Sequence, residues 1–441
     1  MHVERLTLQN FRCFEHRAFD LHPGFTLLVG ANATGKTAIL EGLAVALGAP
    51  LMSVPHAPAR TIRPTEVRRT WRRVGETWGF REHYPTRVVA RGAINGAVAE
   101  WERELRTPKS RTTRVGAKEV RREMDELVLR SQDDDQTLFP FVGYYGTGRL
   151  WHEQSLVTKA PLSPATPASR YSGYQHCLNP SSSARHLVAW IKRWALAQAQ
   201  RKHSLTTLQA VLDAIANCVE DAVEADFDFE QDDIVLEFPT GFRTPFSLLS
   251  DGQRSVAATV GDIALRCAII NPHLRGGARL NTPGVVLIDE LDQHLHPRWQ
   301  RRAIGDLQGT FPHLQFVATS HSPFIIQSVE QGHVINLDDD DVHRPGRSPQ
   351  SIEDIVENVM GVEQPQRSRR FQQMVKAAEE YLQALEGASS AVDSGRLDQL
   401  RERLDSLEEP FADNPGYLAF LRLQRSQAFK TLQDRDLQYL E

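Results

Sequence analysis

The stretch that decides the fold is Gly30-Ala31-Asn32-Ala33-Thr34-Gly35-Lys36-Thr37, which has the pattern GxxxxGK[ST]. The apolar run Phe25–Val29 precedes it and predicts a buried strand, and residues 38–43 after it begin an apolar helix. This context is the one in which the pattern forms a phosphate-binding loop (P-loop), because glycines let backbone N–H groups curl around phosphate oxygens at a helix N-terminus. We therefore predict that Lys36 contacts the β- and γ-phosphates of a nucleotide and that Thr37 offers its hydroxyl to Mg²⁺.

A second element of phosphate chemistry lies about 250 residues later. The apolar run Gly284–Ile288 fits a central parallel strand, and it ends in Asp289 and Glu290. Since active groups gather at the carboxyl ends of such strands, we expect Asp289 to hold Mg²⁺ through water. Glu290 would orient and deprotonate an attacking water.

Two further polar turns stand at the ends of predicted elements. Ser250-Asp251-Gly252-Gln253 precedes an apolar helix over residues 256–270, and its hydroxyl and N–H groups suit a γ-phosphate. Residues 316–319 read as a strand that ends in Ser320-His321-Ser322. Taken alone, His321 is more often a surface or core histidine than a functional one.

In chain order these elements resemble the head of an ABC-type ATPase, and most closely its SMC/RecF-like branch. Asn10-Phe11-Arg12, Leu295-His296-Pro297 and Thr319-Ser320-His321-Ser322-Pro323 resemble further elements of that branch. The resemblance implies an α/β P-loop head with a mixed sheet that binds ATP and Mg²⁺. It also implies a head-to-tail dimer in which residues 250–253, the signature turn, complete the nucleotide site of the opposite subunit. It assigns catalysis to Glu290 and His321, Mg²⁺ to Thr37 and Asp289, and nucleotide contacts to Arg12, Gly30, Asn32, Gly35, Lys36, Thr37, Ala38, Ser250, Gly252, Gln253 and Asp292.

Some positions depart from the pattern of that branch. Asp251 stands where relatives have glycine, and Ala33 and Thr34 stand where many carry glycine and a small residue. The segment between the P-loop and Ser250 is about 210 residues long and has no sustained heptads, unlike the coiled coils of SMC proteins.

We expect four segments: ATPase residues 1–49, an inserted lobe over residues 50–240, ATPase residues 241–345 and a helical tail over residues 346–441. Within the lobe, a hairpin over residues 87–106 turns at Asn95-Gly96, and helices span residues 186–200 and 205–225.

The tail is acidic and has helical periodicity over residues 371–385, 396–407 and 415–440. Together with the string Tyr144-Tyr145-Gly146-Thr147-Gly148-Arg149-Leu150-Trp151, it resembles the ATPases that are encoded beside HNH endonucleases in the anti-phage Septu and retron systems. The resemblance implies an ATPase that regulates a partner nuclease docked on the tail. The alternative is a RecF-like repair ATPase that binds DNA directly, and an ABC importer subunit fits less well. Residues 338–341, all Asp, are read as a solvated loop rather than a metal site.

Composition and charge narrow the class of protein. The 441 residues contain no apolar run near 18 residues, which excludes a membrane-spanning helix, and no secretory signal at the start. The four cysteines are scattered, so a reducing cytoplasm is expected. Residues 60–122 hold 17 Lys and Arg against seven Asp and Glu in a chain of net charge −5. This basic segment fits contact with DNA or RNA, or a solvated arginine-rich face, and the second is favoured because no aromatic stacking pattern accompanies the charge.

Overall fold

The computed structural model describes residues 1–408 except 56, 58, 150–168, 181–184, 202–204, 339–343, 346–349, 363–368 and 388–393. The chain forms two compact units, residues 1–360 and residues 361–441, and each is described by itself. The first unit contains both predicted halves of the ATPase. The proposed boundaries at residues 50 and 241 stay predictions.

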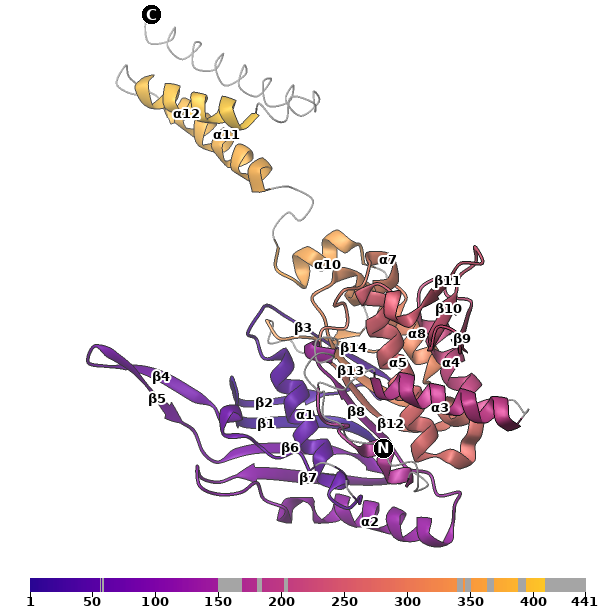
Figure 1. Ribbon diagram of the computed structural model, residues 1–441. Coiled ribbons are helices and arrows are strands. Elements are labelled where there is room, and N and C mark those ends of the chain that lie inside the picture. Colours follow the sequence, from indigo (N-terminus) through magenta and orange to yellow (C-terminus); the bar gives the residue numbers. More distant parts are fainter. Residues whose placement is uncertain are drawn as a thin grey trace, which may run out of the picture. The chain divides into compact units, whose positions relative to one another are not determined.

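The first unit is built on a six-stranded sheet with the order β15-β14-β3-β13-β12-β8 (Figure 1). Its strands are β3 (Phe25–Val29), β8 (Phe141–Tyr145), β12 (Gly284–Ile288), β13 (Leu314–Thr319), β14 (His333–Asn336) and β15 (Arg344–Pro345). All neighbours are parallel except β15, which pairs antiparallel with β14. Since β3, β8, β12 and β13 are buried along their whole length, their continuous apolar runs fit central strands covered on both faces.

A second sheet is antiparallel and has the order β2-β1-β6-β7. It consists of β1 (His2–Phe11), β2 (Phe14–Asp20), β6 (Thr86–Ile94) and β7 (Ala97–Leu105). The predicted hairpin is confirmed, and Asn95 and Gly96 both have positive φ (53° and 82°), as a two-residue turn requires. Strand β2 ends at Asp20, and β3 of the central sheet begins at Phe25. Strands from before and after residue 50 therefore share this sheet.

Helix α1 (Lys36–Leu51) contacts strands of both sheets, which explains why nearly all of its residues are buried. The other helices of this unit are α2 (Lys118–Asp133), α3 (Arg185–Arg201), α4 (Thr206–Cys218), α5 (Asp251–Ile270), α6 (Ala278–Asn281), α7 (Pro297–Gln300), α8 (Ala303–Thr310), α9 (Pro323–Gln327) and α10 (Ile352–Asn358). The helix expected to reach residue 225 ends at Cys218. It is followed by a small antiparallel sheet of β9 (Glu224–Asp228), β10 (Asp233–Glu237) and β11 (Arg243–Pro245).

A two-stranded ribbon of β4 (Arg69–Val74) and β5 (Thr77–Glu82) extends from the body of the unit as a separate arm (Figure 1). At its root, Arg68 N–H donates to the Asn10 carbonyl (2.9 Å), and Val67 forms a bridge with Phe11. The arm is therefore tied to the turn between β1 and β2.

The second unit contains α11 (Arg369–Gly387) and α12 (Ser394–Glu408), which confirms two of the three predicted tail helices. Met374, Ala377, Ala378, Tyr381 and Leu404 form a small core of their own. The predicted helix over residues 415–440 lies outside the described residues. Across the described part of the chain, no helix has the length and apolar character needed to span a bilayer.

Candidate nucleotide-binding site

The carboxyl ends of four neighbouring parallel strands bring the predicted site residues to one edge of the central sheet. The P-loop follows β3, Asp289 follows β12, His321 follows β13, and Asp338 follows β14. Sequence alone placed each of the four at the end of a predicted strand. The sheet order puts β3 between β14 and β13, and this order makes them neighbours.

The P-loop backbone has the shape of an anion cradle. Gly30, Ala33 and Gly35 have positive φ (146°, 68° and 107°), which turns successive N–H groups inward. A Cβ on Gly35 would lie 2.5 Å from the Phe14 ring, so only glycine fits there. Ala33 adopts the left-handed conformation in spite of its side chain, and the departure from glycine at this position is therefore accommodated with some strain.

Lys36 is the first residue of α1, and its side chain is buried against the loop. Its Nζ donates to the carbonyl oxygens of Gly30 and Ala31, both at 2.8 Å. Burial lowers the pKa of Lys36, and four carboxylates oppose this shift: Asp338, Asp289, Glu290 and Asp292. The ammonium thus lies where an anion would meet it, in a site that already holds several negative groups.

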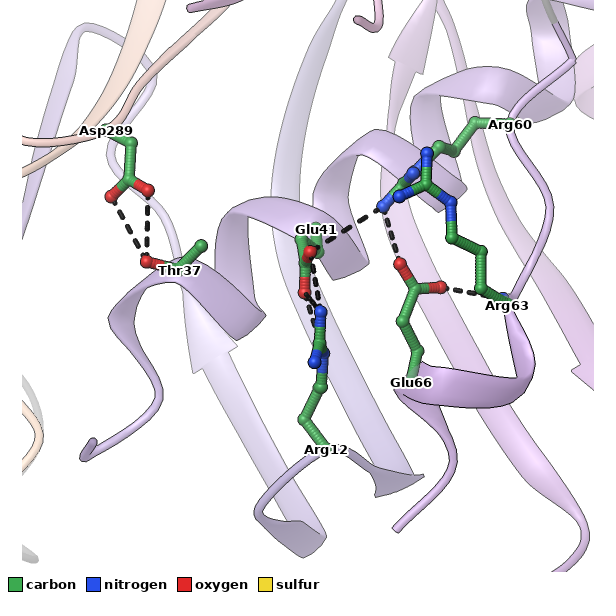
Figure 2. Close-up of polar contacts among 7 residues, drawn as sticks. All are labelled: Arg12, Thr37, Glu41, Arg60, Arg63, Glu66 and Asp289. Carbon is green, nitrogen blue, oxygen red and sulfur yellow. Dashed lines mark hydrogen bonds and ion pairs between the residues drawn. The ribbon is translucent and has the colours of Figure 1, made fainter. Parts of the chain in front are cut away.

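Thr37 and Asp289 lie 252 residues apart in the sequence and contact each other. Thr37 Oγ1 donates to Asp289 Oδ2 and Oδ1 (3.0 and 3.3 Å), as Figure 2 shows. A hydroxyl beside a carboxylate is the kind of oxygen pair that Mg²⁺ binds in nucleotide sites. The two predicted metal residues are therefore brought together, and their donor set fits Mg²⁺.

Thr319 orients this pair and was missed by the sequence analysis as a separate functional residue. It is fully buried, its Oγ1 donates to Asp289 Oδ1 (2.7 Å), and it accepts from the Glu290 N–H (2.7 Å). The one sequence signal for Thr319 was its position at the end of a predicted strand, directly before the polar turn. One hydroxyl thus orients the Asp289 carboxylate and holds the backbone of Glu290, the next residue.

Glu290 and His321 lie on adjacent turns. Glu290 has a φ of 50°, an uncommon backbone conformation for a residue with a side chain, and such outliers gather at functional sites. The backbone N–H of His321 donates to Asp292 Oδ1 (3.3 Å), which links the turn after β13 to the turn after β12.

The signature turn stands elsewhere on the unit. Ser250 caps α5 by accepting from the N–H of Gln253 (3.3 Å), whose side chain accepts from the N–H of Ser250 in return. A Cβ on Gly252 would lie 2.2 Å from the carbonyl oxygen of His294, so the turn packs tightly beneath the loop that follows Asp292. Among the described residues, no hydrogen bond joins residues 250–253 to the P-loop of the same chain.

Arg12 lies in a network of charged side chains beside α1 rather than on the P-loop itself (Figure 2). Its guanidinium donates two hydrogen bonds of 2.8 Å to Glu41, which lies one turn after Thr37. Arg60 pairs with the fully buried Glu66 (2.6 Å) and lies 4.0 Å from Glu41. Burial raises the pKa of Glu66, and Arg60 and the Arg63 N–H oppose it. The network joins the root of the β4–β5 arm to the P-loop helix.

Asp338 contacts the P-loop directly. Its Oδ2 accepts from the N–H of Ala31 (2.6 Å), and the residue lies on an exposed turn, as expected for a solvated loop. Residues 339–341 lie outside the described residues, and the described part of the chain contains no group of three or more His, Cys, Asp or Glu side chains that could hold a metal ion.

Comparisons with known proteins agree with this arrangement. The family described as "AAA domain" matches residues 5–221, and the family described as "AAA domain, putative AbiEii toxin, Type IV TA system" matches residues 181–327. The Retron Vc95 probable ATPase of Vibrio cholerae is 47% identical over 90 residues, and the Septu protein PtuA of Bacillus mycoides is 34% identical over 128. The DNA replication and repair protein RecF of Bifidobacterium adolescentis is 29% identical over 118 residues, 24% of this chain and 27% of RecF. Over these segments the chain is similar to AAA-domain proteins of the retron, Septu and RecF kinds.

These alignments are short. The alignment with the retron protein covers 20% of this chain and 17% of that protein, and the alignment with PtuA covers 27% of this chain and 17% of PtuA. The chain therefore matches less than a fifth of the length of these two relatives. Among solved structures, the SMC head domain from Thermotoga maritima aligns with a TM-score of 0.42 and 13% identity, over 76% of this chain and 95% of that one.

Proposed function

We propose that this ATPase binds ATP with Mg²⁺, hydrolyses it, and uses the nucleotide to control a partner effector, an HNH nuclease of an anti-phage system in the cytoplasm. The observation that supports the chemistry is the contact between Thr37 and Asp289 beside Lys36. Bound Mg²⁺ neutralises phosphate charge in such sites. Lys36 and the loop N–H groups hold the β- and γ-phosphates, Thr37 and Asp289 hold the metal, Glu290 accepts a proton from water, and His321 stands near the γ-phosphate.

The test of this chemistry compares two substitutions. Lys36→Ala removes the cation of the cradle and abolishes binding of a fluorescent ATP analogue. Glu290→Gln keeps the shape but removes the base, so the protein retains ATP and loses turnover by about 10²–10⁴-fold. Unchanged turnover in Glu290→Gln would remove this residue from the mechanism.

The partner is supported by the similarity to the retron and Septu proteins and by the separate helical unit. Residues 361–441 form their own compact unit, which suits a docking module. Co-purification of the tagged full chain with the products of neighbouring genes tests this proposal. A nuclease that is recovered with the wild type but not with charge-reversed α11 and α12 supports it, and a purified ATPase without any partner counts against it.

Direct nucleic-acid binding is the second candidate, and the β4–β5 arm favours it. The pairing register places Trp71 opposite Phe80 and Arg73 opposite Trp78, so these four side chains share one face. Trp71, Trp78 and Phe80 are 61%, 69% and 49% exposed. The expectation that no aromatic pattern accompanies the basic charge is therefore wrong. Exposed aromatic rings beside arginines suit the bases and phosphates of a single strand.

On the other face of the arm lie Arg72 and Arg81, for which no ion pair is present among the described residues. Replacing Trp71 and Trp78 by alanine removes stacking, while Arg72→Gln with Arg81→Gln removes charge. Filter binding of a single-stranded oligonucleotide over a salt series measures the affinity of each variant. Size-exclusion chromatography of the same samples measures its assembly size. If the exposed Phe242→Ala control binds as tightly as the wild type and both arm variants bind weakly, the arm contacts nucleic acid. If the arm variants change only the assembly size, the arm is a subunit contact instead.

A further inference from the structure

A guanidinium stands at a core position of β7. Strand alternation puts Trp101, Arg103 and Leu105 on one face, and all three are buried, with Arg103 only 1% exposed. Trp101 Nε1 donates to the Ala46 carbonyl of α1 (2.9 Å), so this face packs against the P-loop helix. Because arginine is almost never fully buried without a charged partner, Arg103 requires an explanation.

Arg103 has no carboxylate partner among the residues that the structure describes. Its Nε donates to the Thr113 carbonyl (3.0 Å), and its Nη1 lies 3.9 Å from Met52 Sδ. The adjacent Glu104 is already bonded to Arg87 and Arg106 (2.9 and 2.7 Å). Burial, together with the smaller effect of the charges of Arg114 and Arg121, lowers the pKa of Arg103 to about 10. A buried cation without a counter-ion is costly, and an anion bound beside it would offset that cost.

Three more arginines surround Arg103. Arg111 and Arg114 line with it a cavity of about 630 Å³, between the end of α1 and the loop after β7. Arg121 of α2 has a buried Nε without a hydrogen-bond partner. In the described part of the chain none of these three side chains forms an ion pair, so positive charge converges on the cavity with no fixed anion to balance it.

The walls of the cavity are held in place by backbone contacts. The N–H of Thr113 donates to the Glu104 carbonyl (2.8 Å), and the N–H of Glu104 donates to Thr113 Oγ1 (3.0 Å). The N–H of Ile62 donates to Thr112 Oγ1 (3.0 Å) on the opposite wall. A fixed wall keeps the arginines close together even though they repel one another, and such preorganisation favours a ligand that neutralises them.

We propose that this cavity is a second anion site, which binds a phosphate-bearing ligand through Arg103, Arg111 and Arg114. Planar guanidinium groups match phosphate oxygens in a two-point geometry, and the volume suits a small phosphorylated molecule. The ligand is the phosphoanion of either a free metabolite or a nucleic-acid backbone. Met52 directly follows the 16 residues of α1, so the cavity lies about 24 Å along that helix from the P-loop. The proposal therefore does not depend on the proposed ATP hydrolysis.

The test uses the full chain carrying Lys36→Ala, so that the P-loop does not bind the probe. Titration calorimetry with inorganic pyrophosphate is expected to show one site. Arg111→Gln with Arg114→Gln weakens it at least tenfold, while Arg91→Gln, an exposed arginine on the neighbouring strand β6, leaves it unchanged. The proposal is overturned if pyrophosphate fails to bind at millimolar concentration, or if it binds the arginine variant as tightly as the control.

Arg103→Met provides a second measurement that separates a ligand site from a structural role. If Arg103 awaits an anion, removing its charge raises the melting temperature without pyrophosphate and abolishes the rise that pyrophosphate causes. If Arg103 is merely structural, the same substitution lowers the melting temperature, and the proposal fails. A twelve-nucleotide single strand, run in the same titrations, identifies the source of the anion: competition with pyrophosphate indicates a nucleic-acid backbone, and its absence indicates a small molecule.

Discussion

The Oδ2 atom of Asp338 accepts a hydrogen bond of 2.6 Å from the backbone N–H of Ala31, within the loop that would hold nucleotide phosphates. The Asp338 carboxylate thus accepts from a backbone N–H that would otherwise donate to a phosphate oxygen. The same charge is the largest of the four that favour the charged form of Lys36. Asp338 follows the last parallel strand, so it reaches the P-loop only because β14 lies beside β3.

We expect Asp338→Asn to bind ATP about fivefold more tightly, because it removes about 1 kcal/mol of like-charge repulsion from a partly solvated site. Equilibrium titration with a fluorescent ATP analogue measures this affinity. Glu330→Gln, an exposed carboxylate shortly before β14, is the control and changes it little. Weaker binding in Asp338→Asn would mean that the carboxylate supports the nucleotide site rather than competing within it.

Thr319→Val should reduce ATP turnover and raise the Mg²⁺ concentration needed for half-maximal rate, because the Asp289 carboxylate loses the hydroxyl that orients it and the Glu290 N–H loses its acceptor. The unsatisfied groups cost about 1–3 kcal/mol of stability. Thr319→Ser keeps the hydroxyl and restores the Mg²⁺ dependence. A valine variant that lost stability but kept the wild-type Mg²⁺ dependence would show that Thr319 only supports the fold.

The head-to-tail dimer predicts a separation between binding and assembly. Ser250 lies on a turn with no hydrogen bond to its own P-loop in the described chain, so it is free to complete a site on a second subunit. In a Glu290→Gln background with ATP, Ser250→Arg should keep one nucleotide per chain yet remain a monomer by light scattering. An ATP-loaded Glu290→Gln protein that is itself monomeric would count against the dimer.

Glu66→Gln should lower the free energy of unfolding by about 3 kcal/mol, because it leaves the buried guanidinium of Arg60 without its carboxylate. Urea unfolding followed by tryptophan fluorescence measures the loss. Glu15→Gln breaks the ion pair between Glu15 and Arg68. Because the Glu15 side chain is 75% exposed, this substitution should change the free energy of unfolding by less than about 1 kcal/mol. Equal effects of the two substitutions would show that the network in Figure 2 does not stabilise the fold.

The sequence by itself determined the local elements of the nucleotide site. The glycines of residues 30–37, the buried run before them and the apolar helix after them act within a few residues of one another. The same holds for Gly284–Ile288 with its two carboxylates, for the Asn95-Gly96 turn and for the Ser250 cap, since each depends on backbone geometry that neighbouring residues set.

Only the tertiary structure decided which of these elements meet. The order of strands in the central sheet brings Asp289 into contact with Thr37 and Thr319, and Asp338 into contact with the P-loop. No local sequence pattern gives that strand order. Antiparallel pairing put Trp71, Trp78 and Phe80 on one face of the arm, and the packing of β7 against α1 buried Arg103 without a counter-ion. These arrangements join residues that lie tens to hundreds of positions apart in the sequence. They form because the burial of the apolar faces of separate segments fixes the positions of the polar side chains on those segments.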